Sequence, residues 1–325
     1  MTIERAERLT ERQVSEVFRL VGAATETDKV GPLSEQVLLS AREGPPRTSQ
    51  DAIPRSVHLL ACAGAHLSGY AHLEHDPDGD TATAEVVVHP SFRRDGTGTA
   101  LLHALEAALA TRTPSRATLL LWSHGDLVAA RAFASRGGYS KTRELWQMRR
   151  SLRSDAPDLP TVTLPEGFAT RHFLVGRDEE AWLGVNALAF VDHPEQGRIT
   201  RDDLDRRIAQ EWFDALGFIL IEDTRGAAPV LVASHWTKVV PPDSPGIDPT
   251  VGEVYVVGVD PAYQGQGLGR TVTVLGLAHL RGKGLTEAML YVDADNLAAV
   301  ATYSRLDFAR SAVDIMYSRI VHTPM

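Results

Sequence analysis

The sequence is poor in cysteine and has no long apolar run. Cys62 is its single cysteine, which excludes an intrachain disulfide and a zinc site built from cysteines. The apolar residues around Cys62 favour a buried, inert thiol over a nucleophile. No apolar run approaches the roughly 18 residues that a membrane span requires, and the charged N-terminus has no signal-peptide core. These absences predict a cytoplasmic protein that does not bind membranes.

Basic residues are also in deficit. The formal net charge is −9 for 325 residues, which argues against nucleic acid as a partner but leaves room for a small basic pocket that binds an anionic cofactor. His193 and His235 form no metal site, because no third ligand stands at a convincing spacing. The hydrophobic fraction of 43% is typical of a soluble globular protein. The length predicts about two domains, and we expect a monomer that binds a small molecule.

A glycine loop at residues 264–269 is the most informative motif that is present. An apolar strand precedes the loop, and a turn at Asp260-Pro261 lies between that strand and the loop. A helical segment begins directly after the loop. Glycines let backbone N–H groups point into open space, where the helix dipole helps them to bind a phosphate. The same order of strand, Pro turn, glycine loop and helix occurs in residues 86–109. Two such units predict a protein with two similar domains.

The repeat extends beyond the loops. Residues 122–150 match residues 291–319 without a gap after the first few positions. Residues 151–165 hold three prolines and little periodicity, so we place a linker there, between an N-terminal domain of residues 1–150 and a C-terminal domain of residues 166–325. Apolar periodicity predicts helices through residues 1–45, followed by a hairpin near residues 63–66 and a third strand before the first loop.

Other phosphate-binding motifs fit less well. A dinucleotide-binding fingerprint lies near the first strand of a βαβ unit, whereas several antiparallel-looking strands precede both loops. A Walker A loop ends in Gly-Lys-Ser/Thr, and neither copy does. A purely structural turn stays possible for one loop, and is less plausible for two in the same context.

Both loops resemble the Arg/Gln-x-x-Gly-x-Gly/Ala motif of the GCN5-related N-acetyltransferase (GNAT) family. The segment DADNLAAVATYSRLDF resembles the second family signature, an Asn at a helix start followed by a Tyr. This resemblance implies an α/β (α+β) fold with two tandem GNAT domains, each a mixed, mostly antiparallel sheet flanked by helices. It also implies acetyl-CoA as co-substrate without a metal. The CoA pyrophosphate would bind the loop amides, and the pantetheine arm would pair with the preceding strand.

The resemblance implies cofactor contacts in both halves. In the second half they are Val257, Gly258, Val259, Gln264, Gly265, Gln266, Gly267, Leu268, Gly269, Arg270, Asn296, Leu297, Ala298, Ala299, Val300 and Ala301. In the first half they are Val86, Val87, Val88, Arg94, Asp95, Gly96, Thr97, Gly98 and Thr99.

Further segments (HWTKV, GEVYVVGVDP, LYVDADN and HPEQG) resemble the mycothiol synthase family, whose tandem GNAT enzymes acetylate the cysteinyl amine of cysteinyl-glucosaminyl-inositol (desacetylmycothiol). The resemblance implies substrate contacts by Glu35, Glu195, Lys238, Glu253 and Tyr291. Since Glu35 belongs to the first half, that assignment would place the substrate between the domains. Glu195 lies in a turn, and a solvated surface glutamate is nearly as plausible an interpretation of it.

Amide formation from a thioester needs a base for the amine and a proton for the leaving thiolate. The resemblance makes Glu253 the base and Tyr303 the acid in a direct attack. Glu253 alternates with Tyr255 and Val257, which sets it on one face of the sheet. The competing interpretations are an exposed strand glutamate for Glu253 and a packed helix tyrosine for Tyr303.

The repeat supplies an internal control. Counting along it, Ala134 stands in place of Tyr303 and Ala82 in place of Glu253, so the first half is predicted to bind acetyl-CoA, or to have once bound it, without catalysis. On loop charge alone, however, Arg93-Arg94 would favour the first half as the better cofactor site. Two alternatives stay open: acetylation of another small amine, such as an aminoglycoside or polyamine, and a non-catalytic acyl-CoA sensor.

Overall fold

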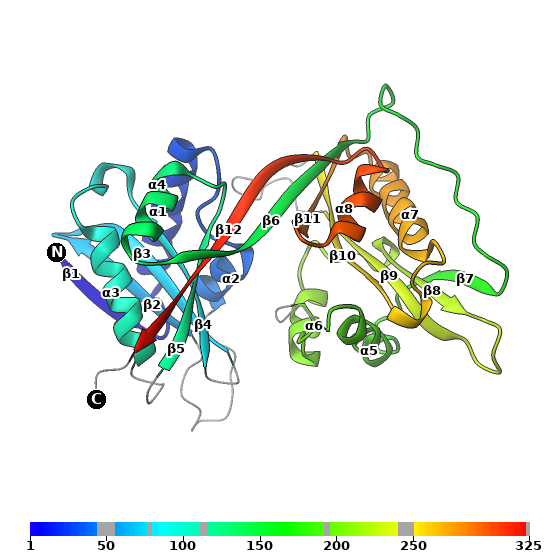
Figure 1. The fold of residues 1–325 in the computed structure, drawn as a ribbon, viewed down its shortest axis with the longest axis horizontal. Coiled ribbons are helices and arrows are strands. Elements are labelled where there is room, and N and C mark those ends of the chain that lie inside the picture. The colour runs from blue at the N-terminus through cyan, green and yellow to red at the C-terminus, as the bar shows by residue number, and fades with distance from the viewer. Residues whose placement is uncertain (44–55, 77–79, 111–115, 192–195, 240–249, 323–325) are drawn as a thin grey trace. The chain divides into compact units, whose positions relative to one another are not determined.

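The computed structural model describes residues 1–43, 56–76, 80–110, 116–191, 196–239 and 250–322. The chain divides into two compact units (Figure 1). Unit 1 comprises Met1–Trp146, Asp293–Asp295 and Ala312–Met325, and unit 2 comprises Gln147–Val292 and Asn296–Ser311. The predicted domain limits follow the sequence repeat and stay a prediction, whereas the compact units are discontinuous along the chain.

The elements of the first half, in chain order, are β1 (Thr2–Ala6), α1 (Glu11–Asp28), α2 (Glu35–Glu43), β2 (Ser56–Ala63), β3 (His66–His75), β4 (Thr81–Val88), the 3-10 helix η1 (Pro90–Phe92), α3 (Thr97–Ala110), β5 (Arg116–Ser123), α4 (Val128–Arg136) and β6 (Ser140–Ser151). Those of the second half are β7 (Phe168–His172), α5 (Glu179–Ala189), α6 (Arg201–Ile208), η2 (Ala215–Gly217), β8 (Phe218–Asp223), β9 (Val230–Val239), β10 (Val251–Val259), η3 (Pro261–Tyr263), α7 (Leu268–Gly282), β11 (Glu287–Asp293), α8 (Leu297–Ser304) and β12 (Ala309–His322).

The sheet of unit 1 has the strand order β1-β2-β3-β4-β5-β12. β4 and β5 are parallel, and the other pairs are antiparallel. Strand residues alternate between two cores: one core packs them against α3 and Ala134 of α4, the other against α1 and α2. The last strand of the sequence therefore completes the sheet of unit 1, because β12 pairs with β5 from Ile315 to His322.

Unit 2 repeats this plan with the order β6-β11-β10-β9-β8-β7, to which β6 contributes from Gln147 onward. β10 and β11 are parallel, while β7, β8, β9 and β10 pair antiparallel in turn. α5 and α6 cover one face over an aromatic core around Trp182 and Trp236, and α7 covers the other face. Mixed sheets flanked by helices in both units confirm the predicted fold class.

The prediction of helix through the first residues is wrong. Thr2–Ala6 form β1, which pairs antiparallel with β2 in the register Thr2↔Cys62 to Ala6↔His58. The helix begins only at Glu11, after Thr10, whose side chain accepts the amide of Gln13 in a capping box. Pairing with a neighbouring strand overrides the local charge pattern here. Cys62 is half-buried rather than fully buried, and burial raises the pKa of its thiol.

A row of titratable side chains crosses the α1–α2 face of unit 1. His58, His72 and Glu85 are aligned on β2, β3 and β4, and His124 and Asp314 continue the row. His124 Nε2 lies 3.5 Å from Glu85 and its Nδ1 lies 3.1 Å from Asp314. Burial alone would lower the pKa of His124, but these two carboxylates outweigh it and raise the pKa to about 10. Glu85, His124 and Asp314 therefore form a buried ionic network, beside which His58 and His72 are neutral.

Candidate functional site

The two central strands of unit 2 separate next to the glycine loop. β10 pairs with β11 from Val251↔Glu287 to Val254↔Leu290, where the described pairing ends. A β-bulge follows between Val254 and Val256, while pairing with β9 continues to Val259↔Ala233. The backbone of residues 256–259 therefore keeps an edge toward β11 that a bound chain could pair with. Val257, Gly258 and Val259, predicted to bind the pantetheine arm, lie on this edge.

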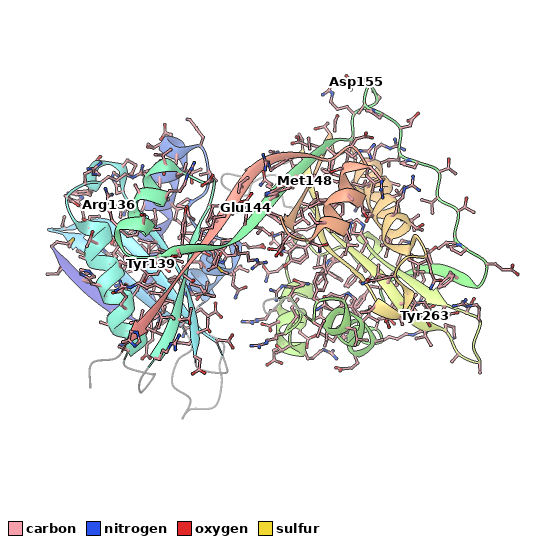
Figure 2. The ribbon with its side chains drawn as sticks, viewed as in Figure 1. Arg136, Tyr139, Glu144, Met148, Asp155 and Tyr263 are labelled. Carbon is pink, nitrogen blue, oxygen red and sulfur yellow. The ribbon has the colours of Figure 1, made fainter. Side chains whose placement is uncertain are left out.

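The loop after β10 leaves its helix N-terminus without a side-chain cap. Gly265 and Gly267 have φ values of 78° and 79°, the left-handed region that favours glycine, and no atom lies within 4 Å of where their Cβ would stand. Gly267 is the N-cap of α7, and no side chain there accepts a helix amide. Tyr263 of the preceding turn, labelled in Figure 2, donates its hydroxyl hydrogen to Asp223 at 3.1 Å. The geometry suits an anion at the N-terminus of α7.

The second predicted motif lies at the same edge of the sheet. Because β10 and β11 are parallel, their carboxyl ends meet there, so the loop before α7 and the turn before α8 are brought together. Asn296 is the N-cap of α8, and its Oδ1 accepts the amide of Ala299 at 3.0 Å. Its side-chain carbonyl is therefore used to begin the helix that carries Leu297–Ala301 and Tyr303.

Three of the five predicted substrate residues share one face of the unit 2 sheet. Glu253 stands opposite Lys238 on β9 and Met289 on β11, and Tyr291 follows two residues after Met289. Residues paired in this way project to the same side. Lys238 is 5% exposed and its Nζ lies 4.9 Å from the ring centre of Trp212 in the α5–α6 core. This face is the one opposite α7.

Tyr303 lies on α8, packed edge-on against Phe308 with ring centres 5.8 Å apart. Burial raises the pKa of its hydroxyl to about 12. The phenol is therefore neutral at physiological pH and able to donate a hydrogen bond. Among the described residues its hydroxyl has no hydrogen-bond partner.

The remaining predicted residues fall elsewhere. Glu35 begins α2 in unit 1 and is exposed. Glu195 and His193 lie outside the described residues. Trp236, which adjoins His235, is fully buried and stacks on Phe218 with ring centres 4.6 Å apart, so it packs in the core. His235 is also buried, and its Nδ1 lies 3.0 Å from the carbonyl of Val272. The described residues contain no cluster of potential metal ligands, and none of their helices is long and apolar enough to cross a membrane.

The glycine loop of unit 1 differs in a way that its sequence conceals. Asp95 accepts the amide of Thr97 at 3.0 Å and its hydroxyl at 2.7 Å, so its carboxylate occupies the helix N-terminus. These two bonds lower the pKa of Asp95. Arg93 is paired with Asp28 through two hydrogen bonds of 2.8 and 2.6 Å. Arg94 has no ion pair with another described residue. An anion at this loop would compete with a built-in carboxylate.

The strand before that loop also differs. β4 pairs with β3 from His75↔Ala82 to Gly69↔Val88 without a bulge. Counting back from the ends of β4 and β10 places Ala82 opposite Glu253. When the bulge of β10 is taken into account, the counterpart of Glu253 is Thr83 instead. The reason is that the bulge at Tyr255 adds one residue to β10. The conclusion that unit 1 has no carboxylate there is unchanged, and Ala134 in place of Tyr303 is buried.

This arrangement of strands, loops and helices matches known proteins along nearly the whole chain. The model of the acetyltransferase (GNAT) family matches residues 32–139 and 182–308. The mycothiol acetyltransferase of Thermomonospora curvata is 50% identical over 310 residues, which cover 95% of this chain and 94% of that protein. The chain belongs to the mycothiol acetyltransferase family. Membership confirms the predicted family and class of enzyme, an acetyltransferase of the GNAT type.

Other mycothiol acetyltransferases are nearly as similar. That of Streptomyces coelicolor is 46% identical over 317 residues, covering 97% of this chain and 94% of that protein. Among solved structures, a tandem GNAT protein from the clavulanic acid biosynthesis pathway superposes with a TM-score of 0.73 at 17% identity, over 100% of this chain and 99% of that chain. A GCN5-related N-acetyltransferase from Sphaerobacter thermophilus gives 0.70 at 21% identity, over 99% and 97%. These two structures support the fold alone.

Proposed function

We propose that this chain transfers the acetyl group of acetyl-CoA to the cysteinyl amine of desacetylmycothiol, and that the transfer takes place in unit 2. The observation that carries the proposal is the coincidence, in one unit, of a strand edge that separates from β11, an uncapped glycine loop, Glu253 and Tyr303. The name shared by the relatives supports the choice of amine.

The CoA portion would be held by backbone groups. Its pyrophosphate would accept the amides of residues 265–269, and the amides of the pantetheine arm would pair with residues 257–259 of β10. GNAT enzymes use acetyl-CoA as their co-substrate, and that binding mode needs no metal. These contacts would hold the thioester carbonyl in one orientation for attack.

The chemistry is a direct displacement. The neutral amine attacks the thioester carbonyl carbon, forming the C–N bond, and the C–S bond then breaks to release CoA thiolate. A terminal amine has a pKa of about 7.7–8.0, so a carboxylate such as Glu253 suffices to remove its proton, directly or through water. Glu253, Lys238 and Tyr291 share a face of the sheet, which supports an acceptor site on the side opposite α7.

Tyr303 would act on the leaving sulfur. An ordinary thiol has a pKa of about 8.5, well below the value of about 12 for Tyr303. Complete proton transfer to an ordinary thiolate would therefore be unfavourable. Burial that raises the pKa of the phenol also raises the pKa of a thiol beside it. We accordingly assign Tyr303 to hydrogen-bond donation to the sulfur as the C–S bond breaks, so that CoA leaves as a hydrogen-bonded thiolate.

Unit 1 is proposed to bind acetyl-CoA weakly and to lack catalysis, since it has Thr83 and Ala134 in place of the two proton-transfer residues and Asp95 at its helix N-terminus. The substrate roles of Glu35, Glu195, Lys238 and Tyr291 stay part of the proposal.

The test is release of free CoA from acetyl-CoA with desacetylmycothiol as acceptor. Glu253→Gln and Tyr303→Phe should each lower kcat by about 10²–10⁴-fold, the usual contribution of general acid–base catalysis. Glu287→Gln, which removes a strand glutamate paired with Arg149 in the same unit, is the matched control and should retain turnover. Full-rate turnover by both test variants would refute the assigned roles. Faster turnover of a polyamine or aminoglycoside than of desacetylmycothiol would refute the substrate.

A further inference from the structure

Tyr291 of β11, one of the proposed substrate residues, takes part in a hydrogen bond that the proposed function does not use. Gln147 of β6 donates from its Nε2 to the Tyr291 hydroxyl at 3.0 Å. Both residues belong to unit 2. Gln147 is half-buried, whereas Tyr291 is 42% exposed. The tyrosine is therefore open to a ligand while a neighbouring strand holds its hydroxyl group.

The side-chain amide of Gln147 is fixed in one orientation. Its Oε1 accepts from Arg149 Nε at 3.1 Å and from the Ser311 hydroxyl at 3.1 Å. A guanidinium group can only donate hydrogen bonds, so the amide oxygen must face Arg149 and the amide nitrogen must face Tyr291. Arg149 is itself paired with Glu287 at 2.6 Å. The Tyr291 oxygen therefore accepts from Gln147, and its hydrogen is directed to a different acceptor.

This direction of hydrogen bonding suits a substrate that offers an oxygen. Tyr291 follows two residues after Met289, which pairs with Glu253, so its side chain lies on the face of the proposed acceptor site. The amide carbonyl and the hydroxyl groups of desacetylmycothiol can all accept a hydrogen bond. A hydroxyl group that already accepts a hydrogen bond is a stronger donor, because hydrogen bonds in a chain polarise one another.

The repeat shows that the contact belongs to unit 2. Since residues 122–150 match residues 291–319, Trp122 stands in place of Tyr291 and Met316 in place of Gln147. Trp122 and Met316 face each other directly in the pairing of β5 with β12. A methionine side chain has no N–H group to donate. Unit 1 therefore keeps the pairing of these two positions without the hydrogen bond.

The hydroxyl beside this pair separates common structure from the addition in unit 2. Ser311 donates to the backbone carbonyl of Gln147 at 3.1 Å, and its counterpart Thr142 donates to that of Met316 at 3.3 Å. In unit 2 the Ser311 hydroxyl is shared with Gln147 Oε1, an acceptor that a methionine does not provide. The backbone contact is common to both units, so the side-chain amide is the part that calls for a role of its own.

We propose that Gln147 is a positioning residue for the acetyl acceptor, because it holds the Tyr291 hydroxyl and directs its hydrogen toward an oxygen of desacetylmycothiol. Ser311 and Arg149 contribute by fixing the amide of Gln147. The inference rests on the proposed function, which supplies the acceptor, and adds the residues that orient one of its contacts. Its effect falls on binding of the acceptor and not on acetyl-CoA.

The test is steady-state kinetics of the full chain, with desacetylmycothiol and acetyl-CoA varied in turn. Gln147→Met introduces the side chain found in unit 1. It should raise KM for desacetylmycothiol about 5-fold to 10-fold, as expected for one lost hydrogen bond, and leave KM for acetyl-CoA within about twofold. Gln147→Glu keeps the shape but makes the side chain an acceptor for Tyr291, so it should raise the same KM by a similar factor. Thr142→Ala, in unit 1, is the matched control for Ser311→Ala, and only the Ser311 variant should raise this KM.

The Tyr291→Phe background separates positioning from a purely structural role. Without the phenol hydroxyl, Gln147→Met should cause no further rise in KM for desacetylmycothiol. An equal rise in both backgrounds would overturn the inference, and so would an unchanged KM in Gln147→Met. Glu287→Gln keeps an oxygen that accepts from Arg149, so it should behave as the wild type here as well.

The hydrogen bond itself can be measured without turnover, by NMR of protein that carries ¹³Cζ-labelled tyrosine. The resonance that disappears in Tyr291→Phe should shift in both Gln147→Met and Gln147→Glu. An unshifted resonance in both variants would overturn the inference whatever the acceptor is. Absence of turnover of desacetylmycothiol by the wild type would instead refute the proposed function, and the KM comparison would then be made with the amine that is acetylated.

Discussion

The two glycine loops share an order of elements but differ in what occupies their helix N-termini. In unit 1 the carboxylate of Asp95 accepts the amide of Thr97, and Arg93 is neutralised by Asp28. In unit 2 the corresponding residues are Gln266 and Gln264, and α7 begins at Gly267 without a side-chain cap. The loop that is more basic in sequence is thus the one whose anion site is partly filled. The number of arginines in a loop is therefore a poor measure of its affinity for phosphate, because an arginine that is already paired with a carboxylate attracts a phosphate less.

The strands before the two loops also differ, in their bulge and in where they separate from the neighbouring strand. β10 carries a bulge and leaves β11 after Val254, whereas β4 has no bulge and pairs with β5 as far as Glu85↔Trp122. In unit 1 the point of separation is next to the buried ion pair of Glu85 and His124. In unit 2 it is next to Tyr255, with Glu253 two residues earlier. We propose that this difference assigns the chemistry to unit 2.

The largest effect should come from closing one loop and not the other. Gly267→Val puts a branched side chain at a φ of 79°, which strains the backbone by roughly 1–2 kcal/mol, and fills the space where a phosphate would bind. We expect kcat/KM for acetyl-CoA to fall about a hundredfold or more. Gly96→Val makes the same change at a φ of 94° in unit 1 and should leave kcat/KM within about twofold. Equal losses would mean that both loops serve the reaction.

Exchanging the residues at the helix N-termini should give a smaller, reciprocal effect. Gln266→Asp introduces a carboxylate beside the proposed pyrophosphate site and should raise the Kd for acetyl-CoA in unit 2 about 10-fold, which is 1.4 kcal/mol. Asp95→Gln releases the amide of Thr97 and should tighten CoA binding at the unit 1 site by a similar factor. Calorimetry with CoA measures both. Unchanged affinities in both variants would show that these amides do not bind phosphate.

The buried histidines should make both units less stable in acid. Burial lowers the pKa of His58, His72 and His235 to about 4 from an ordinary 6.5. The unfolded chain then binds more protons than the folded one between those values, so stability falls as pH drops from about 6.5 to about 4. Because these histidines lie in both units, both units should lose stability in acid.

His124 has the opposite sign. Its pKa of about 10 means that its contribution is complete below pH 6.5 and is lost as pH rises toward 10. Thermal unfolding measured from pH 7 to 10 should show a decline in Tm that His124→Gln reduces. The variant should also start from a lower Tm at pH 7, because Glu85 and Asp314 then lose their buried partner. An unchanged alkaline decline would mean that His124 does not carry this dependence.

The helix caps should give the smallest effect. Asn296 caps α8 with its side chain, whereas its counterpart Leu127 begins α4 without a cap. Asn296→Ala should cost about 1 kcal/mol of stability and lower kcat severalfold by loosening the helix that holds Tyr303. Leu127→Asn should stabilise α4 without changing kcat. A kcat unchanged by Asn296→Ala would mean that this cap does not position Tyr303.

Much of the fold could be predicted from the sequence, because turns rich in glycine and proline separate segments of clear strand or helix periodicity. β1 could not, since it is a short edge strand whose conformation depends on pairing with β2. The loops and Glu253 could be located, but the bulge at Tyr255 cannot be counted from a repeat, so the counterpart of Glu253 was misplaced by one residue. The contact between Asp95 and Thr97 is local and could have been predicted from the sequence. The pairing of Arg93 with Asp28 could not, because it joins residues 65 positions apart.

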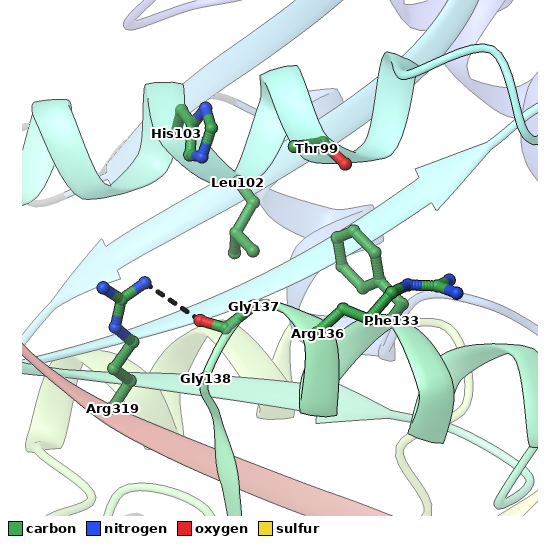
Figure 3. Close-up of a pocket in the computed structure, with 8 residues that line it drawn as sticks. All are labelled: Thr99, Leu102, His103, Phe133, Arg136, Gly137, Gly138 and Arg319. Atoms are coloured by element: carbon green, nitrogen blue, oxygen red, sulfur yellow. Dashed lines mark hydrogen bonds between the residues drawn. The ribbon is translucent and has the colours of Figure 1, made fainter.

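A cavity in unit 1 between α3, α4 and β12, lined by Arg136 and Arg319 among others, could not be predicted from the sequence for a similar reason (Figure 3). Arg136 and Arg319 are brought to one site only because β12 pairs with β5 in unit 1. A division of the chain into an N-terminal and a C-terminal half assigns them to different domains. Nothing in the repeat indicates that the last strand completes the first sheet.

The central claim, that only unit 2 transfers acetyl groups, is tested most directly by counting transfers in a single turnover. Protein saturated with radiolabelled acetyl-CoA is mixed rapidly with excess desacetylmycothiol, and the acetylated product formed in the first turnover is measured per chain. The account predicts a fast phase of one acetyl group per chain, which is abolished by Gly267→Val and retained in Gly96→Val. A fast phase of two acetyl groups per chain, or one that only Gly96→Val removes, would contradict it.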